Sequence, residues 1–241
     1  MTKTKTKTKT KTKSFTKNVT SFPATGWDYD MEYVIELPKF FEDPRWRAIR
    51  LEPPPGPGET RMELDDLLRM QRELEADELK RLRREREVKE EADAFGSPRL
   101  TNFLMLGPTG GYRDTYVLME AMIVLGKIVA VHFKDQFMRP RPSQLEPRLR
   151  PLIPVPGHPS YPSGHALQMH LAAKALATVC RSHEIGQQLF RAADEVAVNR
   201  EWAGLHYASD TAAGKQLALE IFPIVQDAYR ETLRNAAQEW L

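Results

Sequence analysis

Cysteine is almost absent from this sequence of 241 residues, which contains Cys180 alone. A single cysteine excludes an intrachain disulfide and leaves no cysteine cluster for a zinc ion. Cys180 closes an apolar run that begins at Ala172, so we expect a buried and unreactive thiol there rather than a nucleophile.

A large net charge is also missing, because 35 basic residues stand against 33 acidic ones and leave a formal charge of +2. This balance gives no reason to expect nucleic-acid binding. The chain opens with alternating threonine and lysine, where a secretory signal would place an apolar stretch of about 7 to 15 residues. The most apolar stretch, residues 117–133, falls short of the roughly 20 residues of a membrane span. We therefore expect a buried core helix there, and a cytoplasmic protein without a membrane span.

Three regions differ in composition. Residues 1–20 are rich in threonine and lysine and have little to bury, which predicts a flexible basic arm. Residues 21–97 form an N-terminal extension, in which the proline-rich connector 53–58 precedes a long charged helix. Residues 98–241 are predicted to be the catalytic helical domain, because the composition changes after the glycine and proline that end the charged helix.

The long charged helix is predicted over about residues 59–94, because leucines recur at helical spacing on one side of it. The remaining positions are mostly acidic and basic residues that form pairs along an exposed helix. We expect the leucine seam of residues 64–82 to pack either on a second subunit, which would make a homo-oligomer, or on the catalytic domain. The seam consists of Leu64, Leu67, Leu68, Leu74, Leu79 and Leu82.

The rest of the chain is predicted to be helical, since no run of alternating β-branched residues competes with helical periodicity. Eight prolines between Met138 and Pro162 predict an irregular loop, and a loop of this length inside a domain usually serves a function. The helices are expected at about 112–137, 164–183, 184–201, 208–221 and 223–239.

Two cations flank the start of this loop. Lys134 lies near the end of an apolar helix, and Arg141 lies among prolines that restrict its backbone. The planar guanidinium matches two phosphate oxygens, and the ammonium adds a point charge. Alone, however, such a pair is also typical of a solvated helix end.

The sequence Tyr161-Pro-Ser-Gly-His165 opens the next helix. Ser163 is a plausible N-cap, and the free N–H groups of a first helical turn bind anions. Gly164 lets that backbone approach a ligand closely, while His165 has a pKa suited to proton transfer. A capped helix with a surface histidine is the simpler alternative for this segment.

A third cluster combines Arg200, His206 and Asp210. A carboxylate close behind a histidine accepts one ring N–H, which fixes the tautomer and makes the other nitrogen a better nucleophile. Each residue also has a structural alternative, respectively a cation at a helix C-terminus, a buried imidazole and an N-cap.

Together and in this order, the three clusters resemble the signature of the type 2 phosphatidic acid phosphatase and vanadium haloperoxidase superfamily. The resemblance covers about residues 112–222 and implies an all-α helical bundle of the acid phosphatase and vanadium haloperoxidase type, with its pocket at one end. Asn199 departs from the pattern, because the family usually has serine there. Residues 1–97 show no counterpart.

The resemblance implies a phosphomonoester hydrolase that needs no metal and no cofactor and acts on a small-molecule phosphate ester. His206 would attack phosphorus to give a phosphohistidine, Asp210 would orient it, and His165 would serve as acid and base. The phosphate would be bound by Lys134, Arg141, Ser163, Gly164 and Arg200.

The alternative within the same superfamily is a haloperoxidase that holds vanadate on His206 and oxidises halide with peroxide. His158 favours it, because the stretch from Gly157 to His165 looks like the vanadium bromoperoxidases, in which an extra histidine contacts the halide or the peroxo group. A loop histidine that caps a backbone carbonyl beside Pro159 is the simpler alternative for His158. The short chain favours a phosphatase. A non-catalytic anion-binding module is a third alternative, against which the complete set of catalytic residue types argues.

Overall fold

The computed structural model describes residues 34–93, 100, 104 and 111–241, and the secondary structure of this part is helical without a strand. The predicted all-α class is therefore confirmed. The basic arm and the boundary near residue 97 lie outside the described residues, so both stay predictions.

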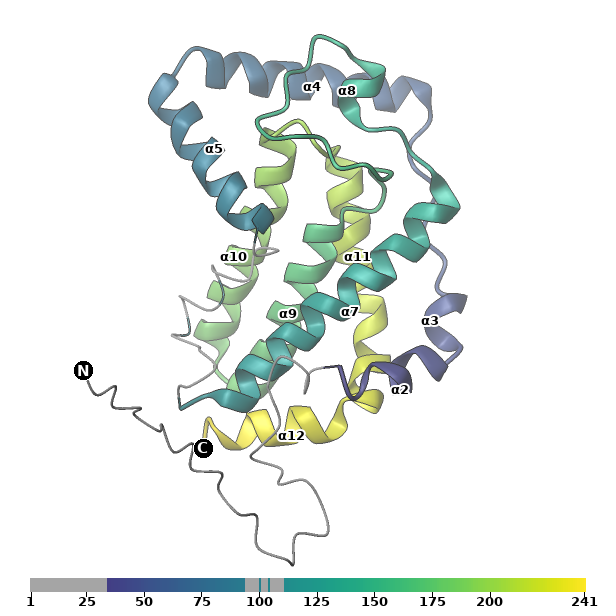
Figure 1. Cartoon of the computed structure of the whole chain (residues 1–241), viewed down its shortest axis with the longest axis vertical. Helices are drawn as coiled ribbons and strands as arrows, with labels where there is room; N and C mark the ends of the chain where they lie inside the picture. Colours follow the sequence, from purple (N-terminus) through teal and green to yellow (C-terminus); the bar gives the residue numbers. More distant parts are fainter. Residues whose placement is uncertain (1–33, 94–99, 101–103, 105–110) are drawn as a thin grey trace, which may run out of the picture.

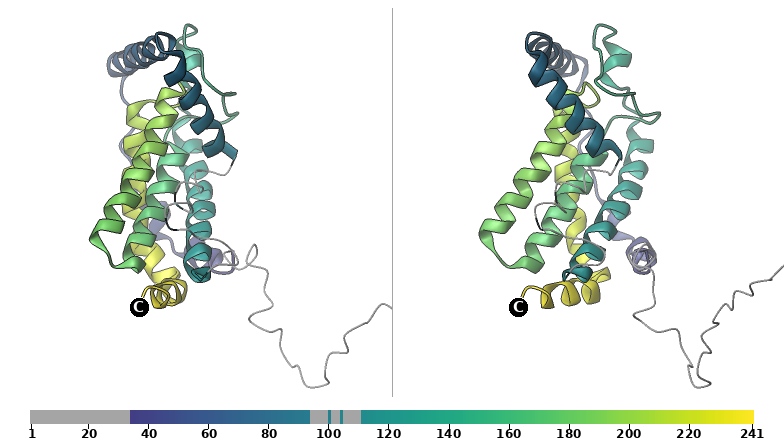
Figure 2. Two further views of the ribbon diagram at one scale, coloured as in Figure 1. Left: turned by 90° about the vertical axis from the view of Figure 1, so that its left-hand side faces the viewer. Right: turned by 60° about the vertical axis from the view of Figure 1, so that its left-hand side comes forward.

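Four helices form the central bundle, and they run side by side along the molecule (Figures 1 and 2). They are α7 (Arg113–Phe137), α9 (Gly164–Cys180), α10 (His183–Trp202) and α11 (Ala208–Ala228). The predicted ends of the first three differ from these by three residues or fewer. Helix α9 packs against each of the other three, because its sequence is apolar around almost its whole circumference.

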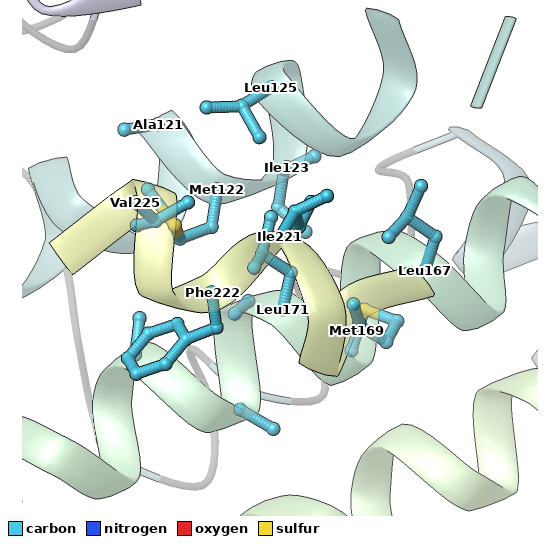
Figure 3. Packing of buried hydrophobic residues seen from close by; sticks show 14 of the residues in the cluster. Ala121, Met122, Ile123, Leu125, Leu167, Met169, Leu171, Ile221, Phe222 and Val225 are labelled. Carbon is cyan, nitrogen blue, oxygen red and sulfur yellow. The ribbon is translucent and has the colours of Figure 1, made fainter. Parts of the chain in front are cut away.

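The core lies where side chains of α7, α9 and α11 interlock (Figure 3). Leu125, Leu167 and Ile221 are completely buried there. Gly214 sits where α11 crosses the start of α9, and a Cβ atom at this position would lie 2.5 Å from the Ser163 carbonyl oxygen. Only glycine permits this close approach, which brings the first turn of α9 and the first turn of α11 to the same end of the bundle.

The division of the last segment at Pro223 is wrong. Helix α11 continues to Ala228, and α12 (Arg230–Gln238) follows. Pro223 is exposed, whereas Phe222, Ile224 and Val225 beside it are buried. Burial of these neighbours holds the helix together, while the carbonyl that loses its partner to the proline lies on the solvent side.

The predicted single charged helix is also wrong, because it is two helices, α4 (Pro57–Glu75) and α5 (Glu78–Asp93), which meet at an angle (Figure 1). The Asp77 carboxylate accepts the N–H of Lys80 at 2.9 Å and so caps the start of α5. Such a cap competes with an uninterrupted helix.

The leucine seam divides at the same place. Leu64, Leu67 and Leu68 of α4 are buried against Leu149 and Tyr207, which lie in the predicted catalytic domain. Leu79 and Leu82 of α5, by contrast, are 80% and 48% exposed. The first half of the seam therefore packs on the predicted catalytic domain of its own chain.

Helix α4 covers the end of the bundle that the proline-rich segment crosses (Figure 1). This segment is irregular as predicted, except for the single turn α8 (Pro142–Leu145). Away from this end, α2 (Leu37–Glu42) and α3 (Arg45–Ala48) contribute Phe40 and Trp46 to the main core.

The helical stretch Arg113–Leu145 is long and apolar enough to cross a membrane, by length and composition alone. Its most apolar window is 61% buried inside the protein. Core helices of globular proteins pass the same test. The sequence led us to expect a shorter apolar stretch, residues 117–133, and most residues of α7 within that stretch are buried. The cytoplasmic location stays a prediction.

Candidate active site

Three helix ends and the proline-rich segment meet around one cavity of about 390 Å³. Lys134 comes from the last turn of α7, Arg200 from the last turn of α10, and His165 from the first turn of α9. The structure thus brings together most residues that the sequence singled out. The predicted residues on the cavity wall are Lys134, Arg141, His158, Gly164, His165, Arg200 and His206.

A tight turn between α10 and α11 presents His206 to the cavity. Gly204 has a φ of 68°, and the Leu205 N–H returns to the Arg200 carbonyl at 3.0 Å. Helix α11 then starts at once, so that Asp210 in its first turn lies beside the His206 ring.

Asp210 holds the imidazole of His206. Its Oδ2 lies 3.0 Å from His206 Nδ1 and also accepts the Tyr207 N–H at 3.1 Å. Burial is the main cause that keeps the pKa of His206 well below its usual value, and the positive charge of Arg141 is the next. The ring is therefore neutral. A hydrogen on Nδ1 that is donated to Asp210 leaves the lone pair of Nε2 available.

Arg141 lies next to that lone pair. Its Nη1 donates to His206 Nε2 at 3.0 Å and to the Leu205 carbonyl at 2.9 Å. Burial lowers the pKa of Arg141 to about 10, with Asp210 acting in the opposite direction. The guanidinium therefore stays charged at neutral pH.

Lys134 adds a second cation, whose Nζ donates to the carbonyls of Pro159 and Ser160 at 2.7 and 2.8 Å. Burial, together with the charge of Arg141, lowers the pKa of Lys134 to about 7. Its charge is therefore sensitive to pH near neutrality.

His165 and Ser163 occupy different places although they are close in sequence. His165 lines the cavity and hydrogen-bonds the backbone of Glu91, and burial keeps its pKa well below the usual value. Ser163 is fully buried and is not among the lining residues; its Oγ accepts the Ala166 N–H at 3.4 Å as the N-cap of α9. The structure therefore places Gly164, but not the Ser163 side chain, on the cavity wall.

His158 is on the wall, on the side of Arg141. The Nη2 of Arg141 donates to His158 Nδ1 at 3.0 Å, and its Nε donates to the His158 carbonyl at 3.0 Å. Burial lowers the pKa of His158 as well. The histidine is thus tied to a cation of the cavity by both its ring and its backbone.

Arg139, for which no role was predicted, supports the Asp210 carboxylate on the side away from His206. Its Nη1 donates to Asp210 Oδ1 at 2.7 Å, its Nη2 donates to Glu63 Oε2 at 2.8 Å, and its guanidinium lies over the Tyr207 ring. Glu63 belongs to α4, so the N-terminal extension reaches the site. Among so many acidic residues on a charged helix, nothing in the sequence distinguished Glu63.

Glu91 of α5 is a second acidic residue that the sequence did not single out. It is 3% exposed, and its Oε2 accepts from Arg200 Nη2 at 2.9 Å. Its Oε1 accepts from Asn199 Nδ2 at 2.7 Å. Asn199, at which the chain departs from the family pattern, therefore contacts the N-terminal extension.

One end of the helical bundle brings together an imidazole that is hydrogen-bonded to a carboxylate, a second imidazole and three cations. These groups are typical of enzymes that act on tetrahedral oxyanions. A family model described as the PAP2 superfamily matches residues 115–226, so this segment is similar to that superfamily. The predicted resemblance is thereby confirmed, and the match supports a phosphoester hydrolase in general. No curated protein matches the chain. Within the described part, no group of three His, Cys, Asp or Glu residues is placed to hold a metal ion.

Proposed function

We propose that the protein is a metal-independent phosphomonoester hydrolase that works through a phosphohistidine on His206. The arrangement of His206 is the observation that supports this most: Asp210 accepts from Nδ1, and Nε2 meets the Arg141 guanidinium in the cavity. A phosphoryl group that enters between Nε2 and Arg141 meets a nucleophile and a cation together.

In the first step, His206 Nε2 forms a bond to phosphorus and the bond from phosphorus to the ester oxygen breaks. The leaving alkoxide takes a proton from His165. In the second step, His165 removes a proton from water, the oxygen attacks phosphorus, and the bond to Nε2 breaks to release inorganic phosphate.

The protonation of His165 depends on the substrate. Arg200 and His206 are the main charged or polar groups that lower the pKa of His165 after burial itself. A bound phosphate dianion neutralises the cations and favours the imidazolium, so that the acid is formed in the complex. Lys134, Arg141 and Arg200 spread the charge of the equatorial oxygens.

Hydrolysis of p-nitrophenyl phosphate by the purified chain tests this proposal. His206→Ala should abolish turnover, and His165→Ala should lower it by about 10² to 10⁴. His183→Ala is a matched control, because His183 is exposed at the start of α10, away from the cavity. Full activity of His206→Ala would remove the nucleophile and the proposal with it.

A vanadate-dependent haloperoxidase is the second candidate, favoured by the position of His158 beside Arg141 on the cavity wall. His206 Nε2 and the surrounding cations fit a vanadate ion, which would supply the activation of peroxide for halide oxidation. His158→Ala should leave ester hydrolysis within a few fold if the protein is a phosphatase. Bromination of a phenol dye with vanadate, peroxide and bromide, lost in His158→Ala, would instead assign the haloperoxidase.

A further inference from the structure

The end of α5 packs against Arg200, although it lies outside the segment that matches the superfamily. The side chain of Arg200 is 1% exposed, and its Nη2 donates to the Val88 carbonyl at 3.0 Å as well as to Glu91. Val88 is itself completely buried against Ala203 and Leu205. The helix end is therefore packed in place rather than resting on the surface.

Asn199 joins the same contact from α10. Its Nδ2 donates to Glu91 Oε1 at 2.7 Å, and its Oδ1 accepts from Arg84 Nη1. An amide donates to one residue of α5 and accepts from another at the same time, whereas the shorter serine side chain of the family pattern reaches less far and carries one donor. The asparagine and the acidic helix are therefore matched to each other.

We propose that Glu91 is a positioning residue of the active site, which acts with Asn199 to hold the Arg200 guanidinium in place for the phosphate group. This inference rests on the proposed phosphate-binding cavity. It assigns a role in substrate binding to the N-terminal extension.

The nitrogen atoms of the Arg200 guanidinium differ in their hydrogen bonds. Glu91 and Val88 occupy Nη2, while the buried Nε has no hydrogen-bond partner among the described residues. Arg200 also lines the cavity. A bound phosphate oxygen is the acceptor that this guanidinium lacks, and a long side chain that is fixed beforehand loses less entropy when the anion binds.

A buried carboxylate next to an anion site also lowers the affinity for phosphate, because the two negative charges repel each other. The arrangement favours positioning, since Lys134 and Arg141 reach the same cavity and would repel Arg200 if its charge were uncompensated. The two effects predict opposite results when Glu91 is removed, which makes the proposal testable.

The test is the dissociation constant of inorganic phosphate, measured by calorimetry on the full chain. Glu91→Ala should weaken binding by about tenfold to hundredfold, the range for loss of a residue that orients a ligand. The KM for p-nitrophenyl phosphate should rise by a similar factor, with a smaller change in kcat. Glu90→Ala should bind like the wild type, because the Glu90 side chain is 67% exposed on the same helix.

Two further variants separate positioning from a merely structural role. Glu91→Gln keeps one acceptor oxygen for Arg200 but loses the negative charge and the second acceptor, so its phosphate affinity should fall between those of the wild type and Glu91→Ala. This variant also covers the case in which Glu91→Ala does not fold. In an Arg200→Ala background, Glu91→Ala should cause no further loss of phosphate affinity, since its effect passes through Arg200.

Phosphate binding by Glu91→Ala that equals or exceeds that of Glu90→Ala would overturn the inference. Additive losses in the double variant would overturn it too. If the wild type binds phosphate but hydrolyses no ester, the proposed function fails while this inference stands. If the wild type binds no phosphate, both fail.

Discussion

Arg139 lies between two carboxylates that come from distant parts of the chain. Its Nη1 is 2.7 Å from Asp210 Oδ1, and its Nη2 is 2.8 Å from Glu63 Oε2. The Arg139 side chain is 5% exposed, so water cannot replace it when it is removed. Arg139→Leu therefore leaves the buried Asp210 and the partly buried Glu63 without this cation.

Loss of one partner from a buried ion pair costs roughly 3 to 5 kcal/mol of unfolding free energy. Arg69→Leu is the matched control on α4, because Arg69 and Asp66 form a pair of similar length with side chains that are 63% and 65% exposed. Such surface pairs contribute about 0 to 1 kcal/mol.

The cost should also depend on pH. Burial raises the pKa of Asp210, and Arg139 opposes that rise. Without Arg139 the folded-state pKa rises further above the unfolded value of about 3.9. A carboxyl group whose folded pKa is raised destabilises the fold as pH increases through the interval between the two values, so the deficit of the variant should grow with pH.

Urea denaturation of Arg139→Leu and Arg69→Leu at about pH 5 and about pH 8 measures both effects. Activity should fall together with stability, because a protonated Asp210 no longer holds the His206 ring as an anion. A loss of stability no greater than that of Arg69→Leu, or a deficit that shrinks with rising pH, would show that Arg139 does not stabilise a buried Asp210 carboxylate.

Three other changes test separate parts of the structure. Because burial lowers the pKa of Lys134 to about 7, the cavity loses a cation as pH rises through that value. The value of kcat/KM should therefore fall in that pH range, and Lys134→Met should remove this limb of the pH profile. Leu64→Ala should cost about 2 to 5 kcal/mol in denaturant unfolding, because the side chain is 4% exposed against the proline-rich loop, whereas Leu79→Ala, at an 80% exposed position, should change stability by less than about 0.5 kcal/mol. Gly214→Ala should lower Tm and activity together, since its Cβ would lie 2.5 Å from a backbone oxygen at the start of α9. Gly186→Ala, whose Cβ would lie 3.4 Å from the Ala177 Cβ, should keep both near the wild-type values. Equal effects of the two substitutions would contradict the close crossing of α9 and α11.

Local signals in the sequence predicted much of the fold. Continuous apolar periodicity predicted α7, α9 and α10, because each of these helices buries a wide face. The break at Asp77 and the continuous helix through Pro223 were missed, since both depend on tertiary context. Asp77 caps α5 as a helix separate from α4, and Pro223 is tolerated within α11 because its neighbours are buried.

The candidate site divides in the same way. His206, Asp210 and Arg141 stand out because their types and spacing are unusual together. Glu63 and Glu91 do not, because a glutamate that contacts the bundle from a charged helix has the same sequence context as one that faces solvent. Only the packing of α4 and α5 on the catalytic part shows which acidic residues face its arginines.

The proposed function depends above all on covalent phosphorylation of His206 during turnover. The most direct measurement is rapid quenching of the chain with p-nitrophenyl phosphate, followed by mass spectrometry of the peptides under alkaline conditions that preserve phosphohistidine. A phosphoryl group on His206, formed as fast as p-nitrophenol is released and absent from His206→Ala, is the predicted result. Steady hydrolysis with no phosphate on His206, or with the label on another residue, would contradict it.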